Sequence, residues 1–260
     1  MALLGSSVAW DAWALFDEMP VIHMLRPLQS SGRRLLNLHL GPQADSPCDS
    51  WRLAVETNNR RDWSTVPANC EEYVGNYMKG GQYLADSKAV VDEAIAYAQG
   101  LELGGQGKEV WVFDVDETTL SNLPFYAKHG FGAKPFDWSE YTEYVREASA
   151  PALPETLRLY KKLQELGIKP VILTGRREDK RSATAQNLKN AGYLDYEMLL
   201  LKYIYRCFFA FVWTSGERKK LVDAGRYVIV GNIGDQWSDI LGAPEGARTF
   251  KLPDPMYYIG

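Results

Sequence analysis

Four short runs of apolar residues constrain the fold of this chain more than any other feature. The runs are Val110–Phe113, Val171–Leu173, Met198–Leu201 and Tyr227–Val230. A continuous apolar run of this length is typical of a strand that is buried on both faces, as in a parallel sheet. The sequence therefore predicts four parallel β-strands.

Helix patterns separate these runs. One pattern spans Leu157–Leu166 and ends at Gly167, a second covers about 178–190, and a third begins near Ser215. Strands that alternate with helices predict an α/β fold with a doubly wound parallel sheet. The aromatic residues between about 120 and 154 form an insert after the first strand, which either covers the site or is a surface excursion.

Composition excludes several kinds of partner. The formal net charge is −4 at pH 7, so a nucleic acid is not expected, because phosphate backbones attract basic surfaces. The richest apolar stretch, Met198–Trp213, is short and interrupted by Lys202 and Arg206, so no membrane span is predicted. With only three His and three Cys, a metal would be held mainly by oxygen atoms. This favours a hard cation such as Mg²⁺.

Acidic residues follow the first and fourth predicted strands, where ligands bind in a fold of this kind. Asp114 and Asp116 follow the first strand, and Asp235 follows the fourth. Carboxylates this close repel one another unless a cation or a proton lies between them. A divalent metal suits the arrangement, with one carboxylate free to attack an electrophile and another to handle a proton. Asp239, one helical turn beyond Asp235, is expected to orient the metal ligands.

Polar residues also follow the second strand. We expect phosphate oxygens to bind here, through the hydroxyl of Thr174 and the backbone at Gly175, where the lack of a side chain allows close approach. Arg176 would add a positive charge. The alternative is a strand-to-helix turn capped by Thr174. Any single Asp at a strand end is likewise more often a cap, but polar clusters at three strand ends favour a site.

The combined motifs resemble the haloacid dehalogenase-like (HAD) hydrolases. DVDET at 114–118 is similar to their DxDx[ST] signature, LTGR at 173–176 to their second motif, and GDQWSD at 234–239 to their acidic fourth motif. The stretches CDSWRLAVETNN, VWVFDVDETTLSNLPFYA and FKLPDPMYYIG look like those of plant class-B-like acid phosphatases and vegetative storage proteins. The resemblance covers about residues 48–200 and 215–260.

This resemblance implies a Mg²⁺-dependent acid phosphatase that hydrolyses phosphate monoesters through an aspartyl-phosphate. Asp114 would be the nucleophile, and Asp116 the general acid for the leaving alcohol and then the base for water. Thr174 would hold the phosphoryl group. Mg²⁺ would be held by the Asp114 side chain, the Asp116 backbone carbonyl and Asp235. The alternative on the same fold is a catalytically weak or inactive vegetative storage protein.

The chain departs from the family pattern at the third motif. The family has a lysine there that pairs with the nucleophile and the phosphate, whereas this chain has Thr214. A charge-assisted contact of that kind contributes about 1.5–3 kcal/mol. Its loss implies an impaired enzyme or favours the storage alternative, and neither Lys202, Lys219 nor Lys220 is expected to replace it.

The aromatic segment at 203–213 lies just upstream, where the family has a polar, glycine-containing loop. One hypothesis is that it is translated intron or a misplaced splice boundary, which sequencing of the mature transcript would test. The alternative is a genuine hydrophobic edge between a strand and a helix.

The remaining expectations concern the N-terminal part. Residues 1–47 are interpreted as an atypical or disordered leader and 48–260 as a single HAD-like domain with a helical N-terminal region, including a helix capped by Asp86. The leader lacks a basic start and is not a convincing signal peptide.

The family resemblance suggests a secreted or vacuolar protein and leaves a homodimer open. Cys48 and Cys70 form either a disulfide or two buried thiols.

Overall fold

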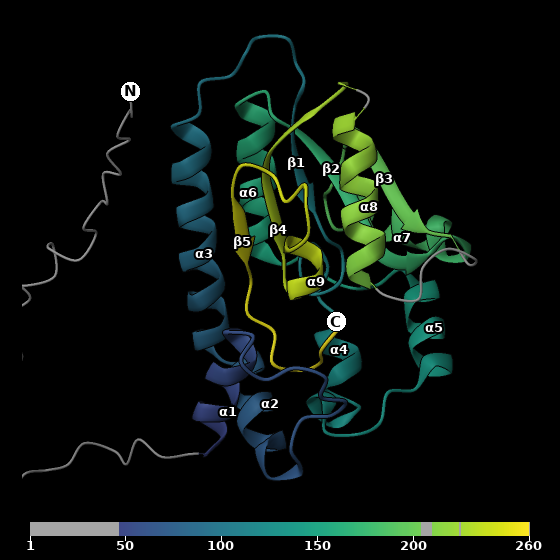
Figure 1. The fold of residues 1–260 in the computed structure, drawn as a ribbon. Coiled ribbons are helices and arrows are strands. Elements are labelled where there is room, and N and C mark those ends of the chain that lie inside the picture. Colours follow the sequence, from purple (N-terminus) through teal and green to yellow (C-terminus); the bar gives the residue numbers. More distant parts are fainter. Residues whose placement is uncertain (1–46, 204–209, 224, 260) are drawn as a thin grey trace, which may run out of the picture. The chain divides into compact units, whose positions relative to one another are not determined.

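A parallel sheet is the central element of the computed structural model, which describes residues 47–203, 210–223 and 225–259 (Figure 1). Its five strands lie in the order β3-β2-β1-β4-β5. They are β1 (Glu109–Phe113), β2 (Lys169–Arg177), β3 (Met198–Lys202), β4 (Val228–Gly234) and β5 (Thr249–Lys251). The doubly wound parallel sheet is thus confirmed, and β5 is an edge strand that the apolar runs did not predict.

Helices precede the sheet and connect its strands. They are α1 (Pro47–Glu56), α2 (Glu71–Lys79), α3 (Gly81–Gln99), α4 (Leu123–Tyr126), α5 (Trp138–Glu147), α6 (Pro154–Glu165), α7 (Arg181–Asn190), α8 (Ala210–Asp223) and α9 (Trp237–Ile240). The expected cap at Asp86 is wrong, because α3 begins at Gly81. The Asp86 carboxylate instead accepts hydrogen bonds from the side chains of Tyr77 and Gln82.

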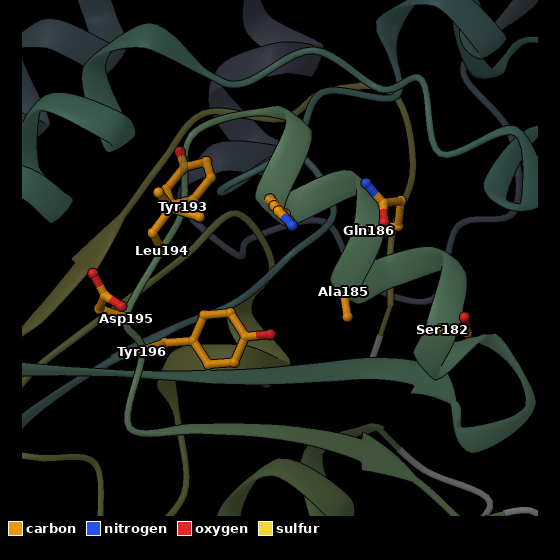
Figure 2. A pocket seen from close by; sticks show the side chains of 8 residues that line it. Ser182, Ala185, Gln186, Tyr193, Leu194, Asp195 and Tyr196 are labelled. Carbon is orange, nitrogen blue, oxygen red and sulfur yellow. The ribbon is translucent and has the colours of Figure 1, made fainter.

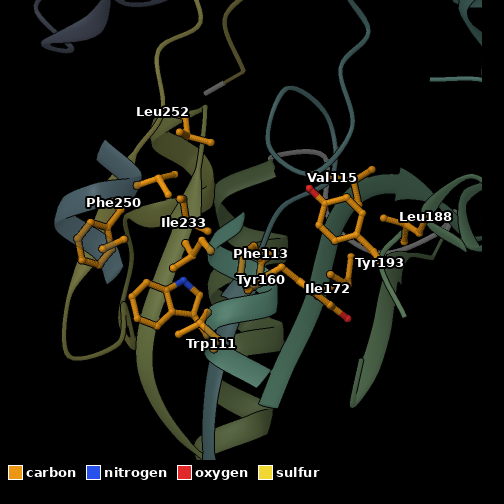
Figure 3. Close-up of a cluster of buried hydrophobic side chains, with 14 of the residues drawn as sticks. Trp111, Phe113, Val115, Tyr160, Ile172, Leu188, Tyr193, Ile233, Phe250 and Leu252 are labelled. Atoms are coloured by element: carbon orange, nitrogen blue, oxygen red, sulfur yellow. The ribbon is translucent and has the colours of Figure 1, made fainter. Parts of the chain in front are cut away.

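The side chains of β1 alternate between two apolar layers, which is why the whole run is hydrophobic. Val110 and Val112 pack with Trp213 of α8 on one face. Trp111 and Phe113 pack on the other face with α3 and α6, in the cluster that Figure 3 shows. That cluster also contains Tyr160, Ile172, Leu188, Tyr193, Ile233 and Phe250.

Strands β2 and β4 extend further than the sequence predicts. Thr174 pairs with Leu201 in the parallel ladder, and Gly231 and Asn232 pair with β1. Backbone pairing with a neighbouring strand therefore continues through residues that the hydrophobic pattern assigns to turns. As a result, the polar motif residues are held by the ladder itself.

A second apolar cluster involves α1 and α2, which lie beyond the carboxyl ends of the strands (Figure 1). It combines residues of α1 and α2, of the insert and of the C-terminal segment, including Trp51, Trp63, Phe125 and Met256. Cys48 and Cys70, which are 22 residues apart, form a disulfide that joins α1 to the turn before α2. The disulfide alternative is therefore correct in this structure.

Two of the sequence-based interpretations concern residues that are only partly described. Residues 1–46 of the predicted leader and 204–209 of the aromatic segment lie outside the described residues. Ala210–Trp213 belong to α8. Within the described ranges, no helix combines the length and the apolar composition needed to cross a bilayer.

Candidate active site

Three carboxylates converge where β1 and β4 end. Asp114 directly follows β1, Asp235 follows β4, and Asp239 lies on α9. Each offers an oxygen atom, and these oxygen atoms all lie within 4.8 Å of one another. The parallel sheet produces this convergence because β1 and β4 are paired neighbours whose carboxyl ends meet at one edge.

A close backbone approach brings Asp239 into this cluster. A side chain at Gly234 would place its Cβ only 2.6 Å from the Cβ of Asp239, so the strand end must be a glycine. The Asp239 carboxylate accepts a hydrogen bond from the backbone N–H of Gln236 at 3.1 Å, which caps α9. The sequence-based expectation gave Asp239 only the role of orienting the metal ligands, whereas its carboxylate lies among the candidate ligand oxygens themselves.

Burial and mutual repulsion make the ionised form of this cluster costly. Burial, followed by the charges of Asp239 and Asp235, raises the pKa of Asp114 well above its ordinary value. Burial and the charge of Asp235 raise the pKa of Asp239 in the same direction. Among the ion pairs of the described residues, none involves Asp114, Asp235 or Asp239. A divalent cation would relieve this repulsion, and carboxylate oxygens are the ligands that Mg²⁺ prefers.

Asp116 lies in a different environment from Asp114. The Nε of Arg176 donates to both carboxylate oxygens of Asp116 at 3.1 and 3.0 Å, and Nη2 donates to Oδ1 at 2.7 Å. Burial alone would raise the pKa of Asp116, but the charge and hydrogen bonds of Arg176 lower it below its usual value. Arg176 therefore contacts Asp116 rather than standing free to bind a ligand.

Two residues of the insert also hold Asp116, and the sequence reasoning missed both. Asn122 Nδ2 donates to Asp116 Oδ1 at 2.6 Å, and the Tyr141 hydroxyl donates to the same oxygen at 2.7 Å. Tyr141 lies on α5 and is 8 % exposed. The insert therefore packs against Asp116 and is not a plain surface excursion. The aromatic content of the insert was the one sequence feature that pointed to a contact with the site, and no sequence pattern identified Tyr141 in particular.

Thr174 and Gly175 lie in β2, next to the strand that carries Asp114. The Thr174 hydroxyl oxygen accepts from the backbone N–H of Arg176 at 3.1 Å, and the side chain is fully buried. Among the described residues, apart from Gly175 and its two chain neighbours, no heavy atom lies within 4 Å of where a Cβ on Gly175 would be. Gly175 thus leaves room for a ligand to approach the backbone, although its φ requires no glycine.

Thr214 occupies the position where the family pattern has a lysine. It is buried in α8 and its hydroxyl donates to the backbone carbonyl of Ser238 at 2.6 Å. Lys219 pairs with Asp223, and Lys220 pairs with Glu217 and lies over the Trp213 ring. Neither lysine of α8 takes the place of the missing cation.

A surface hollow elsewhere in the fold shares no residue with these carboxylates. It measures about 440 Å³ and is lined by α7 and the loop before β3, including Gln186, Lys189, Tyr193 and Tyr196 (Figure 2). Asp195 is the one acidic residue among those that line it, so it offers no group of carboxylates to a cation. The carboxylates, rather than this hollow, are therefore the candidate active site.

Comparisons with known proteins agree with the motifs. The family model for subfamily IIIB (acid phosphatase) of the HAD superfamily matches residues 36–260. "Acid phosphatase 1" of Solanum lycopersicum is 47% identical over 213 residues, which cover 82% of this chain and 83% of that protein. "Vegetative storage protein 2" of Arabidopsis thaliana is 46% identical over 214 residues, covering 82% and 80%. The "Stem 28 kDa glycoprotein" of Glycine max is 46% identical over 230 residues, covering 86% and 89%.

Solved structures share the fold at lower sequence identity. The structure of the class C acid phosphatase from Bacillus anthracis superposes with a TM-score of 0.61 at 21% identity, covering 74% of this chain and 86% of that one. This likeness supports the α/β architecture.

Proposed function

We propose, from the premise that this chain belongs to the acid phosphatases of HAD superfamily subfamily IIIB, that it hydrolyses phosphate monoesters through an aspartyl-phosphate on Asp114. The single observation that carries the proposal is the convergence of Asp114, Asp235 and Asp239, whose oxygen atoms lie within 4.8 Å of one another. A buried trio of carboxylates with no ion-pair partner among the described residues is costly without a cation.

Mg²⁺ fits this set of donors. Asp114, Asp235 and Asp239 supply hard oxygen atoms, and the backbone carbonyl of Asp116 is a further proposed ligand. When bound, the cation would neutralise charge on the phosphoryl oxygens and on the carboxylates around them.

The chain's own residues then account for both chemical steps. An Asp114 oxygen attacks phosphorus, the ester P–O bond breaks, and Asp116 gives a proton to the leaving alcohol. In the second step Asp116 takes a proton from water as the water oxygen attacks phosphorus. The bond from phosphorus to Asp114 breaks, which releases inorganic phosphate and restores both carboxylic groups. Thr174 can donate its hydroxyl hydrogen to the phosphoryl oxygens because its oxygen already accepts from Arg176.

Asp116 is better prepared for the second step than for the first. Arg176 favours its carboxylate form, which suits a base, whereas an acid must first take up a proton. An acidic medium supplies that proton more readily. The pairing therefore makes the protonation of Asp116 the demanding part of the first step.

A storage protein on the same fold is the second candidate, and Thr214 is the observation that favours it. The relatives include vegetative storage proteins at about the same identity as the acid phosphatase. Asp114 and Asp116 are both retained, however, and a protein used only as a nitrogen store has no need of them.

We further propose that the protein is secreted or vacuolar. Its relatives include a stem glycoprotein and a vegetative storage protein, and the Cys48–Cys70 disulfide favours an oxidising compartment. The leader at 1–47, the single domain at 48–260 and a homodimer stay predictions.

Turnover of an aryl phosphate with Mg²⁺ at mildly acidic pH tests the enzyme proposal. The wild-type chain should release phosphate, and Asp114→Asn should abolish the release. Asp223→Asn, the same change on the exposed face of α8, is the matched control and should stay active. An inactive wild-type chain would leave the storage protein as the supported function.

A further inference from the structure

The C-terminal segment returns to the end of β4, beside the carboxylate cluster. Leu252, Asp254 and Met256 are each 1 % exposed, although the segment has no regular secondary structure. The backbone N–H of Leu252 donates to the carbonyl of Gly234 at 2.9 Å. Residues 252–256 are thus built into the protein beside the end of β4.

The side chain of Gln236 joins this segment to Asp235. Its Nε2 donates to Asp235 Oδ2 at 2.8 Å and to Asp254 Oδ2 at 3.0 Å. Its Oε1 accepts from the backbone N–H of Ile259 at 3.0 Å. Gln236 is 6 % exposed, so both N–H groups and the carbonyl oxygen of this buried amide are engaged.

The opposite oxygen of Asp235 is held from the first motif. Thr118 Oγ1 donates to Asp235 Oδ1 at 3.1 Å. The Asp235 carboxylate therefore has one oxygen held by the loop after β1 and the other by the amide that anchors the C-terminal segment. A carboxylate held at both oxygens has little freedom to rotate.

Tyr257 ties the same segment to the loop that carries Asp116. Its hydroxyl donates to Glu117 Oε2 at 3.2 Å, and its ring stacks on Tyr126 with the centroids 5.4 Å apart. The C-terminal segment thus contacts both strand-end loops that supply the proposed metal ligands.

We propose that Gln236 is a positioning residue for the metal ligand Asp235, and that the segment Asp254–Ile259 sets the affinity for the divalent cation through it. The inference rests on the proposed metal site. Gln236 also places two N–H groups between the carboxylates of Asp235 and Asp254, which would otherwise repel each other. Groups that orient a metal ligand typically change metal affinity about 10–100-fold.

Calorimetric titration of the metal-free protein with Mg²⁺ tests this role without depending on turnover. Gln236→Met keeps the size of the side chain but removes the amide, and should raise the Kd for Mg²⁺ about 10–100-fold. Gln186→Met, the same change on the exposed surface of α7, is the control and should bind Mg²⁺ like the wild type. In steady-state assays, the Mg²⁺ concentration needed for half activity should rise in Gln236→Met, while kcat at saturating Mg²⁺ should largely recover.

A chain that ends at Tyr258 is the second variant. It lacks Ile259 and Gly260, and with them the backbone N–H that donates to Gln236 Oε1, but it keeps both hydrogen bonds of Gln236 Nε2 and should show a smaller rise in Kd. If Gln236→Met does not fold, this truncated chain decides the question.

The outcomes separate the two proposals. Wild-type affinity in a folded Gln236→Met protein would overturn the role of Gln236 alone, and wild-type affinity in the truncated chain would overturn the role of the C-terminal segment. A wild-type chain that takes up no Mg²⁺ would overturn the metal site itself, and the role of Gln236 with it.

Discussion

Arg176 holds Asp116 by three hydrogen bonds of 2.7 to 3.1 Å, and the Arg176 side chain is only 2% exposed. The two residues are neighbours because β1 and β2 are paired strands whose carboxyl ends meet. Because of this pair, Asp114 and Asp116, the two carboxylates of the first motif, lie in different electrostatic environments. Asp116 is kept ionised, whereas burial and neighbouring carboxylates favour the protonated form of Asp114.

Replacing Arg176 by Met should change both stability and the pH profile. Breaking a buried ion pair costs about 3 kcal/mol at the lower end of measured values, because the remaining charge is left unpaired. The pKa of Asp116 is lower in the folded protein than in the unfolded chain, where it is about 3.9. The ion pair therefore stabilises the folded protein fully at pH values above that unfolded pKa. This contribution disappears as the pH falls through the folded pKa.

Urea unfolding measures the difference in the free energy of unfolding between the wild type and Arg176→Met. This difference should be smaller at about pH 3 than at about pH 7. The acidic limb of the rate profile should also move to higher pH in the variant. Arg177→Met, in which an exposed arginine loses its pairing with Asp179, is the matched control. An equal loss of stability at both pH values would contradict the claim that Arg176 lowers the pKa of Asp116.

Restoring a lysine at position 214 should raise phosphatase activity. The added cation would stabilise the transferring phosphoryl group by about 1.5 kcal/mol or more, which corresponds to about a tenfold increase in kcat/KM. The same change removes the hydrogen bond from Thr214 to Ser238, so the thermal midpoint should fall slightly. Thr214→Met supplies similar length without charge and should bring no gain. Equal activity in the two variants would show that charge at this position is irrelevant.

Replacing Asp235 by Asn should separate metal binding from stability. Without Mg²⁺ the variant should unfold at a higher temperature than the wild type, because one member of a mutually repelling cluster is neutral. Saturating Mg²⁺ should stabilise the wild type by about 2.7 kcal/mol at a hundredfold excess over Kd, and the variant much less. Thermal denaturation with and without Mg²⁺ measures both effects. A variant with the full Mg²⁺ response would remove Asp235 from the site.

His129 should make the insert slightly more stable in acid. Its Nδ1 lies 2.7 Å from the carbonyl oxygen of Phe125 and its Nε2 lies 2.5 Å from a carboxylate oxygen of Glu140. Two oxygen acceptors favour the doubly protonated ring, and the Phe125 carbonyl, together with Glu140, raises the pKa of His129 above its ordinary value.

A raised pKa gives stability that is fully present below the unfolded pKa of about 6.5 and is lost as the pH rises through the folded pKa. Because Glu140 is 61% exposed, the effect should stay below about 1 kcal/mol. His129→Gln should therefore lower the thermal midpoint more at about pH 5.5 than at about pH 8. Glu143→Gln, on the same helix and paired only with Arg146 among the described ion pairs, should lack this pH dependence.

The strands and motifs could be predicted because they depend on local patterns. A buried parallel strand must be apolar on both faces, so a run of four apolar residues predicts β1. The acidic residues that follow this run predict a site, because ligands bind at the carboxyl ends of such strands. The ends of β2 and β4 could not be predicted from the hydrophobic pattern. Thr174 and Asn232 stay in the sheet through backbone pairing with neighbouring strands rather than through apolar side chains.

The sequence by itself determined the layered α/β fold, the carboxylates at the strand ends and the substitution at Thr214, since each follows from residue type and order. Only the tertiary structure decided which charges meet. It paired Arg176 with Asp116, brought Tyr141 of the insert to the same carboxylate, and joined Asp235 to Asp254 through Gln236. These contacts bridge residues that are far apart in the chain or lie on different loops. Their strength depends on distance, direction and burial, and those quantities exist only once the chain is folded.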